Sequence, residues 1–162
     1  MIFLNQFKNT AFVKSIDKVL SSFGIMKSME RTHVDTFTEN RINNIKGDLI
    51  AKSNYGMIWF KFQEIEDYNI LNTTIVSGSN INNETNCLLH FMSDIKSDYS
   101  DYLWTLNSDE PQIKSNFSNV SNRWITQLSY HLEKDDIDFI KNKQYYRIQL
   151  DYGKKSMPFI VI

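Results

Sequence analysis

The chain has 162 residues, of which 18 are basic and 19 acidic, so its formal net charge at pH 7 is −1. Hydrophobic residues make up 41% and aromatic residues 14%, which argues against a disordered chain and is enough to build the core of one domain. We therefore expect a single globular domain over residues 1–162. The near-neutral charge also argues against direct nucleic-acid binding, which normally requires a basic stripe.

Neither a secretory signal nor a membrane-spanning segment is predicted. The first residues lack a charged region followed by a long apolar region, and no uncharged apolar run approaches the length that crosses a bilayer. The single cysteine, Cys87, cannot form an internal disulfide, which is typical of a reducing compartment. We expect a cytoplasmic protein with no membrane association.

The first predicted element is a helix over residues 10–23. Its apolar face consists of Phe12, Ile16, Val19, Leu20 and Phe23, and Gly24 follows at the position of a left-handed cap. The opposite face carries only Lys14, Asp17 and Lys18 as charges, so we expect the helix to pack on the core and not on a membrane surface.

Strand-like runs follow the first helix. A possible strand lies around residues 32–38, and three further runs, 48–53, 57–65 and 68–76, form an antiparallel meander. In the middle run Ile58, Phe60 and Phe62 alternate with polar or bulky residues and should share one face. Residues 77–86 are small and polar, which predicts a long loop.

The second half of the chain alternates between strand and helix signals. Residues 87–92 and 101–106 are predicted strands. A second helix is predicted over residues 116–132, because one stripe contains Phe117, Val120, Trp124, Leu128 and Leu132. A short turn of helix over residues 134–142 and a hairpin of residues 145–152 and 157–162 complete the chain. We predict an α+β fold, in which an antiparallel sheet of about six to seven strands is packed by two amphipathic helices.

No motif of known chemistry is visible. The five glycines form neither a P-loop nor a dinucleotide-binding pattern. His33, His90 and His131 lie in different predicted elements, which does not favour a metal site. Cys87 stands beside two leucines and is read as a buried structural residue. The sequence thus predicts no catalytic residues, no metal and no cofactor.

The charges are strongly segregated along the chain. Residues 62–112 contain nine acids and one base, whereas residues 1–61 contain nine bases and five acids, and residues 113–162 contain eight bases and five acids. The three segments therefore have net charges of 1 − 9 = −8, 9 − 5 = +4 and 8 − 5 = +3. The central segment could be a solvated surface or a face for a basic partner.

Aromatic residues within this acidic segment favour the second interpretation, because steering charge and aromatic anchors together are typical of protein-binding surfaces. The candidate partner-binding residues are Glu64, Glu66, Asp67, Asp94, Asp98, Tyr99, Asp101, Tyr102 and Trp104. Nuclease active sites are basic because they hold phosphates. We therefore predict a non-enzymatic inhibitor, an immunity protein or antitoxin that neutralises a basic, nuclease-type bacterial toxin domain. It should be a monomer or dimer when free.

Two alternatives remain open at this point. The first is a phage-encoded protein, either an anti-defence inhibitor or a small structural component, and the structural component should form defined homo-oligomers. The second is a small enzyme whose site is assembled from distant residues. The enzyme hypothesis predicts a concave pocket in which His33, His90 or His131 meets carboxylates or Cys87.

Overall fold

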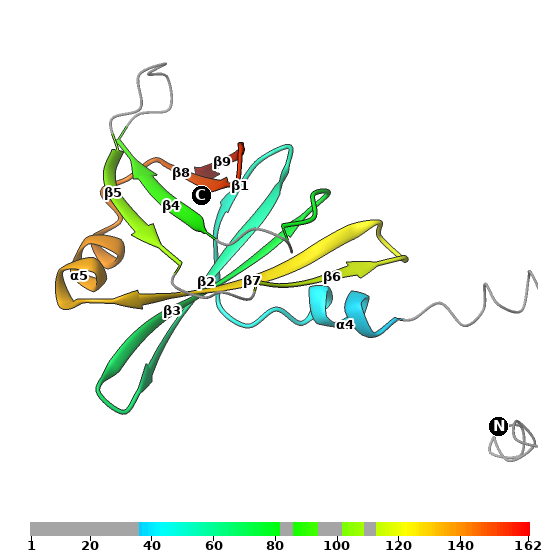
Figure 1. The fold of residues 1–162 in the computed structure, drawn as a ribbon, viewed down its shortest axis with the longest axis horizontal. Helices are drawn as coiled ribbons and strands as arrows, with labels where there is room; N and C mark the ends of the chain where they lie inside the picture. Colours follow the sequence, from blue (N-terminus) through cyan, green and yellow to red (C-terminus); the bar gives the residue numbers. More distant parts are fainter. Residues whose placement is uncertain (1–35, 82–85, 94–101, 109–112) are drawn as a thin grey trace, which may run out of the picture. The chain divides into compact units, whose positions relative to one another are not determined.

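The computed structural model describes residues 36–81, 86–93, 102–108 and 113–162. Within these residues, nine strands form one antiparallel sheet in the order β5-β4-β8-β9-β1-β2-β3-β7-β6 (Figure 1). The strands are β1 (Asp48–Lys52), β2 (Gly56–Ile65), β3 (Tyr68–Ser77), β4 (Cys87–Met92), β5 (Tyr102–Asn107), β6 (Lys114–Ser118), β7 (Arg123–Leu132), β8 (Arg147–Tyr152) and β9 (Lys155–Val161). Two short helices are present in the described part, α4 (Phe37–Asn43) and α5 (Lys134–Asn142).

The fold is mostly β, and the prediction of an α+β fold with six to seven strands and two amphipathic helices is wrong. The predicted helix 116–132 is instead the end of β6, a turn and the ten-residue strand β7. Along β7, Leu128, Tyr130 and Leu132 are buried and alternate with more exposed residues, which is the period of a strand. Trp, Ile, Thr and Tyr in this segment also favour a pleated surface.

Other predicted elements have mixed outcomes. The three runs of the meander are confirmed as β1, β2 and β3, and the short helix at 134–142 is confirmed as α5. The possible strand at 32–38 is wrong where it can be compared, since α4 begins at Phe37. The helix predicted over 10–23 lies outside the described residues. For that reason the single-domain prediction for residues 1–162 stays a prediction.

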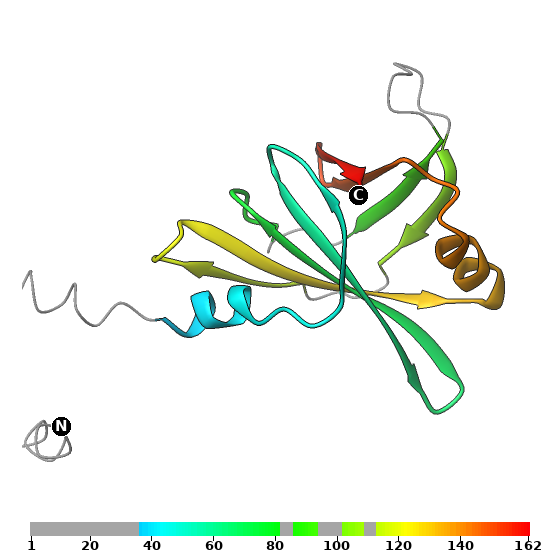
Figure 2. The same cartoon turned by 180° about the vertical axis from the view of Figure 1, so that it is seen from behind.

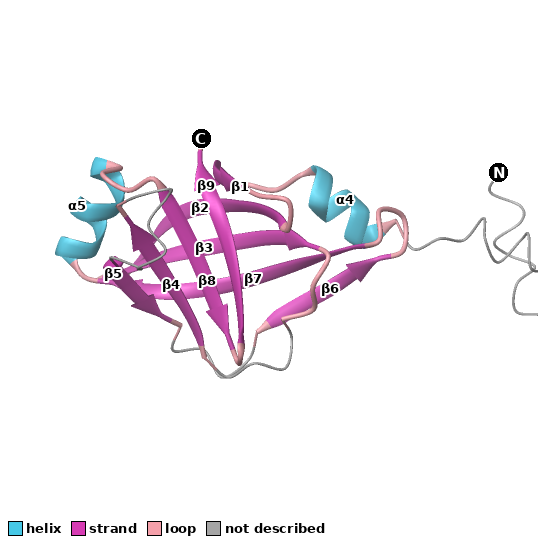
Figure 3. Ribbon diagram, turned by 90° about the horizontal axis from the view of Figure 1, so that it is seen from above, coloured by secondary structure: helices cyan, strands magenta, loops and turns pink. Residues whose placement is uncertain are grey.

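The sheet bends so that its two halves pack face to face. The rings of Phe60 on β2 and Phe91 on β4 lie 6.1 Å apart, although three strands separate β2 from β4 in the sheet. The seam lies at β9 and β1, which pair only through Ala51 with Val161 and Lys52 with Ile160. Figure 3 shows β4, β8 and β9 crossing in front of β2, β3 and β7. The main core fills the space between these halves.

The half of the sheet that contains β2, β3 and β7 carries a smaller apolar cluster on its outer face, beneath α4. Ile42 of α4 packs there with Val76 of β3 and Ile125 of β7, and Trp59 of β2 lies against them. This cluster follows from strand alternation, because Ile58 and Phe60 enter the main core while Trp59 points to the other side. The predicted common face of Ile58 and Phe60 is thereby confirmed. The cluster anchors α4 on the sheet.

Helix α5 closes the opposite end of the bent sheet (Figure 3). Its start is a capping box, in which the side chains of Glu133 and Asp136 each accept a hydrogen bond from the other's backbone N–H. Its end is the left-handed residue Lys143. Phe139 of α5 packs against Phe91, with ring centroids 5.7 Å apart, so the helix covers the core opening. No helix among the described residues is long and apolar enough to cross a membrane.

Candidate functional site

The predicted partner-binding residues fall into three groups. Glu64, Glu66 and Asp67 lie at the tip of the β2–β3 hairpin. Tyr102 and Trp104 lie on β5, which is an edge strand of the sheet. The remaining four, Asp94, Asp98, Tyr99 and Asp101, lie outside the described residues. The structure therefore allows an account of five of the nine residues.

The end of the β2–β3 hairpin forms a finger, seen from both sides in Figures 1 and 2, and β7 pairs with β3 as far as Asn69. The ladder of paired residues continues to the tip, where Glu64 pairs with Asn69 and Ile65 pairs with Tyr68. Glu66 turns the chain with a φ of 55°. Ile65 is 46% exposed and Tyr68 is 58% exposed. The finger, residues 62–71, thus presents three carboxylates together with solvent-exposed apolar side chains.

Helix α5 adjoins the finger near its tip. Asn69 of β3 pairs with Leu132 of β7, the residue just before the start of the helix. The ammonium of Lys141 lies 5.4 Å from the ring centre of Phe62. The first turn of α5 and its cap add the acids Glu133, Asp135 and Asp136, followed by Asp138. We call the finger and these four acids the acidic end.

The two aromatic residues on β5 are used for internal packing. Trp104 stacks on Phe139 with ring centroids 5.0 Å apart, and its indole N–H donates a 2.6 Å hydrogen bond to Asp136. Tyr102 stacks on His90 at 4.1 Å and remains 44% exposed. Trp104 therefore positions α5. Its link to the acidic end runs through that helix.

His90 forms the contact with a carboxylate that the enzyme hypothesis requires, but its side chain is almost completely buried. Its Nε2 lies 3.1 Å from the Asp151 carboxylate and its Nδ1 lies 2.8 Å from the Thr105 hydroxyl. The Tyr102 ring covers the imidazole, which is only 6% exposed. Because both ring nitrogens are engaged, the arrangement is that of a structural histidine on the sheet surface.

Among the described residues, Cys87 and His131 do not assemble with His90. Cys87 is fully buried in the main core, as predicted. His131 lies on β7, where its ring is 5.4 Å from that of Tyr68. In the ranges that the structure describes, no group of three or more His, Cys, Asp or Glu residues could hold a metal ion.

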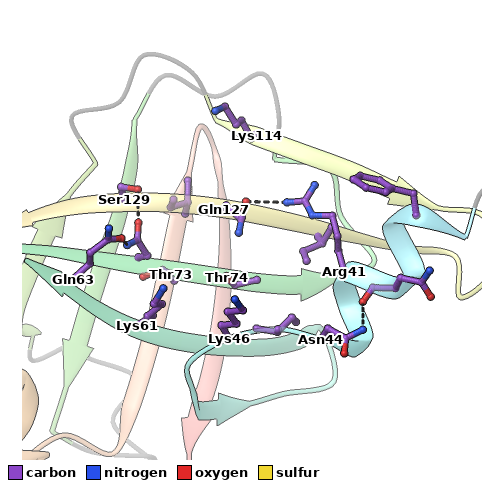
Figure 4. A pocket seen from close by; sticks show the side chains of 16 residues that line it. Arg41, Asn44, Lys46, Lys61, Gln63, Thr73, Thr74, Lys114, Gln127 and Ser129 are labelled. Carbon is purple, nitrogen blue, oxygen red and sulfur yellow. Dashed lines mark hydrogen bonds between the residues drawn. The ribbon is translucent and has the colours of Figure 1, made fainter. Parts of the chain in front are cut away.

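A second site, which the sequence analysis missed, is a groove of about 600 Å³ on the outer face of the sheet. Strands β2, β3 and β7 form its floor, and α4 and β6 border it (Figure 4). Its basic lining residues are Arg41, Lys46, Lys61 and Lys114. They come from the two segments whose net charges are +4 and +3, so the segregated charge was the available signal. Only the fold shows that these residues converge.

Comparison of the chain with protein-family models, with curated proteins and with solved structures finds no match.

Proposed function

We propose that the protein is a non-enzymatic inhibitor of the immunity-protein or antitoxin class, which binds a basic toxin domain through its acidic end. The observation that carries the proposal is the finger. It combines the carboxylates of Glu64, Glu66 and Asp67 with the exposed side chains of Ile65 and Tyr68.

The two kinds of side chain have separate roles in this proposal. Carboxylates on a protruding element steer a basic partner during the encounter and increase the association rate. Tyr68 and Ile65 supply apolar area that is buried only in the complex and so supports a long-lived interaction. A finger of this shape suits a concave surface such as an active-site cleft that holds phosphates.

The finger is also preorganised for binding. Strand pairing extends without interruption from Gly56 with Ser77 to Ile65 with Tyr68. At its base, the Asn72 side chain donates to Gln63 at 3.0 Å and accepts from Ser129 at 2.9 Å. An element that is already ordered loses less conformational entropy when it binds. In the proposed role the protein acts in the cytoplasm, as a monomer or dimer until the toxin domain arrives.

The test compares two doubly substituted proteins with matched numbers of reversed charges. E64K/E66K reverses the finger, and K154E/K155E reverses two exposed lysines of the β8–β9 turn. Each protein, tagged at the N-terminus, is used to capture partners from lysate of the source cell. The captured partner is then purified, and its association rate is measured by surface plasmon resonance at low and high salt.

We expect one stoichiometric basic partner that is toxic when expressed alone. At low salt its association should slow at least tenfold with E64K/E66K and less than twofold with K154E/K155E. An unchanged association rate with E64K/E66K would refute the role of the finger. Recovery of the chain alone as a defined homo-oligomer would favour the phage structural component instead.

A further inference from the structure

The groove on the outer sheet face has the size of a small-molecule site and a largely polar lining. Its volume of about 600 Å³ falls within the range of about 300–1,000 Å³ that is usual for such sites. Figure 4 shows the side chains of Lys61, Lys46, Arg41 and Lys114 arranged around a floor that includes Gln127 and Ser129. The floor is polar because it is the face of the sheet opposite the main core.

No carboxylate of the described residues compensates the positive charge of the groove, since none of those that line it is an aspartate or a glutamate. Within the described part of the chain, Lys46, Lys61 and Lys114 form no salt bridge. The hydrogen bonds that Arg41 donates to described residues go to neutral amides, at 2.9 Å to Asn116 and at 2.8 Å to Gln127. A concave surface with one sign of charge concentrates ions of the opposite sign, so the groove should attract anions.

The amide side chains add hydrogen-bond donors to this charge. The Gln127 carbonyl oxygen accepts from Arg41, and the Gln63 carbonyl oxygen accepts from Asn72. Each glutamine therefore has its acceptor engaged, whereas its NH₂ group forms no hydrogen bond to another described residue. Asn72 in turn accepts from the Ser129 hydroxyl. The chain of hydrogen bonds across the floor therefore runs from Ser129 through Asn72 to Gln63 and ends at the donor NH₂ group of Gln63. Free donors beside lysines suit phosphate oxygens and disfavour a cation.

The strand register gives the separation of the outer lysines. Lys114 pairs with Gln127, Gln127 pairs with Thr74, and Thr74 pairs with Trp59, two residues before Lys61. Three strand spacings of about 4.8 Å place the β2 and β6 backbones roughly 14 Å apart. An elongated molecule with several anionic groups can span this distance and contact Lys61 and Lys114 at the same time.

We propose that the groove binds a nucleotide-sized organic phosphate that carries two or more anionic groups. Its phosphates would contact Arg41 and the lysines, and its polar remainder would accept hydrogen bonds from Gln63 and Gln127. The proposal rests on the opposite charge from that of the acidic end, although Gln63 belongs to the finger as well as to the groove.

The experiment is isothermal titration calorimetry on the full chain with ATP, AMP and inorganic pyrophosphate as probes. The test variant is K61Q/K114Q, because these lysines form no ion pair whose loss would disturb the fold. The matched control is K154Q/K155Q, which removes two lysines from the β8–β9 turn, and neither residue lines the groove. Thermal melting without ligand verifies that each variant folds as the parent protein does.

We expect saturable binding of ATP at one site, at least tenfold tighter than that of AMP. The ATP affinity should fall at least tenfold in K61Q/K114Q and less than twofold in K154Q/K155Q. The proposal is overturned if neither ATP nor pyrophosphate binds, or if both doubly substituted proteins lose affinity equally. It is also overturned if a single-stranded decanucleotide binds more than tenfold tighter than ATP, which would make the groove a site for a nucleic-acid backbone.

Discussion

The indole nitrogen of Trp104 donates a hydrogen bond of 2.6 Å to the carboxylate of Asp136, which joins the edge strand β5 to helix α5. The same carboxylate accepts the backbone N–H of Glu133 at 2.7 Å and so completes the helix cap. The Asp136 side chain thus caps the start of α5 and also ties it to the sheet. Because α5 forms part of the acidic end, this contact also orders the proposed partner-binding surface.

The D136A variant should lose both interactions of this carboxylate. Loss of a helix cap costs about 1 kcal/mol, and loss of a hydrogen bond to a charged group costs about 1.5 kcal/mol. We expect the free energy of unfolding to fall by roughly 2 kcal/mol in urea denaturation, since the two effects are not fully additive. The matched control is D135A, an exposed neighbour in the same first turn, which should cost about 0.5 kcal/mol or less. Equal effects of the two substitutions would contradict the anchoring role of Asp136.

Removal of the buried Tyr130 hydroxyl, in contrast, should not lower the stability of the protein. Tyr130 is fully buried in the main core, and its hydroxyl has no hydrogen-bond partner among the described residues. Burial, with a smaller contribution from Cys87, raises the pKa of this phenol well above its ordinary value, so it stays neutral. Removal of an unpaired buried polar group is nearly neutral or stabilising. We expect Y130F to leave the free energy of unfolding unchanged or to raise it by about 1 kcal/mol.

Tyr145 provides the control for this prediction. It is also buried, but its hydroxyl donates to the backbone oxygen of Ile140 at 3.2 Å. The Y145F substitution leaves that carbonyl without this donor, so it should destabilise the protein by about 1 kcal/mol. Urea denaturation of the two variants side by side measures the difference. A destabilised Y130F would show that its hydroxyl has a partner in solution.

The sequence predicted the parts of the fold whose pattern has a single interpretation. Ile58, Phe60 and Phe62 recur at every second residue, and β2 matches the predicted strand to within one residue. Residues 123–132 were misread because Trp124, Leu128 and Leu132 are four apart, and this spacing satisfies both a helical stripe and one face of a strand. Tyr130, two residues from both Leu128 and Leu132, shares their strand face but does not fit the helical stripe.

The two candidate sites also differ in how far the sequence alone predicts them. The three acids of the finger are local in sequence, so a turn between two predicted strands was enough to bring them together. The groove instead combines Arg41, Lys61 and Lys114, which meet only because β2, β3, β7 and β6 are neighbours in the sheet. Strand order between distant segments depends on tertiary packing, and no local pattern of a single sequence determines it.

The carboxylate of Glu39 links α4 to the turn after β6. It accepts hydrogen bonds of 2.6 Å from both Ser118 and Ser121, and Arg123 lies 3.8 Å away. The hydrogen bond from Ser118, then that from Ser121, and more weakly the charge of Arg123 lower the pKa of Glu39 below its ordinary value of 4.5, although burial opposes them. The interaction therefore favours the ionised form in the folded protein.

This lowered pKa predicts a pH-dependent contribution of Glu39 to stability. A carboxylate whose pKa is lower in the folded state stabilises the protein above its unfolded-state pKa, and the effect is lost as the pH falls through the folded-state pKa. We expect E39Q to melt at a lower temperature than the parent protein at pH 7, and this difference to shrink steadily below about pH 4.5. Thermal melts at pH 7, 5, 4 and 3 measure it. In an S121A background, where one of the two donors is absent, the effect of E39Q at pH 7 should be smaller. A difference that stays constant across the pH range would show that Glu39 acts through its shape and not through its charge.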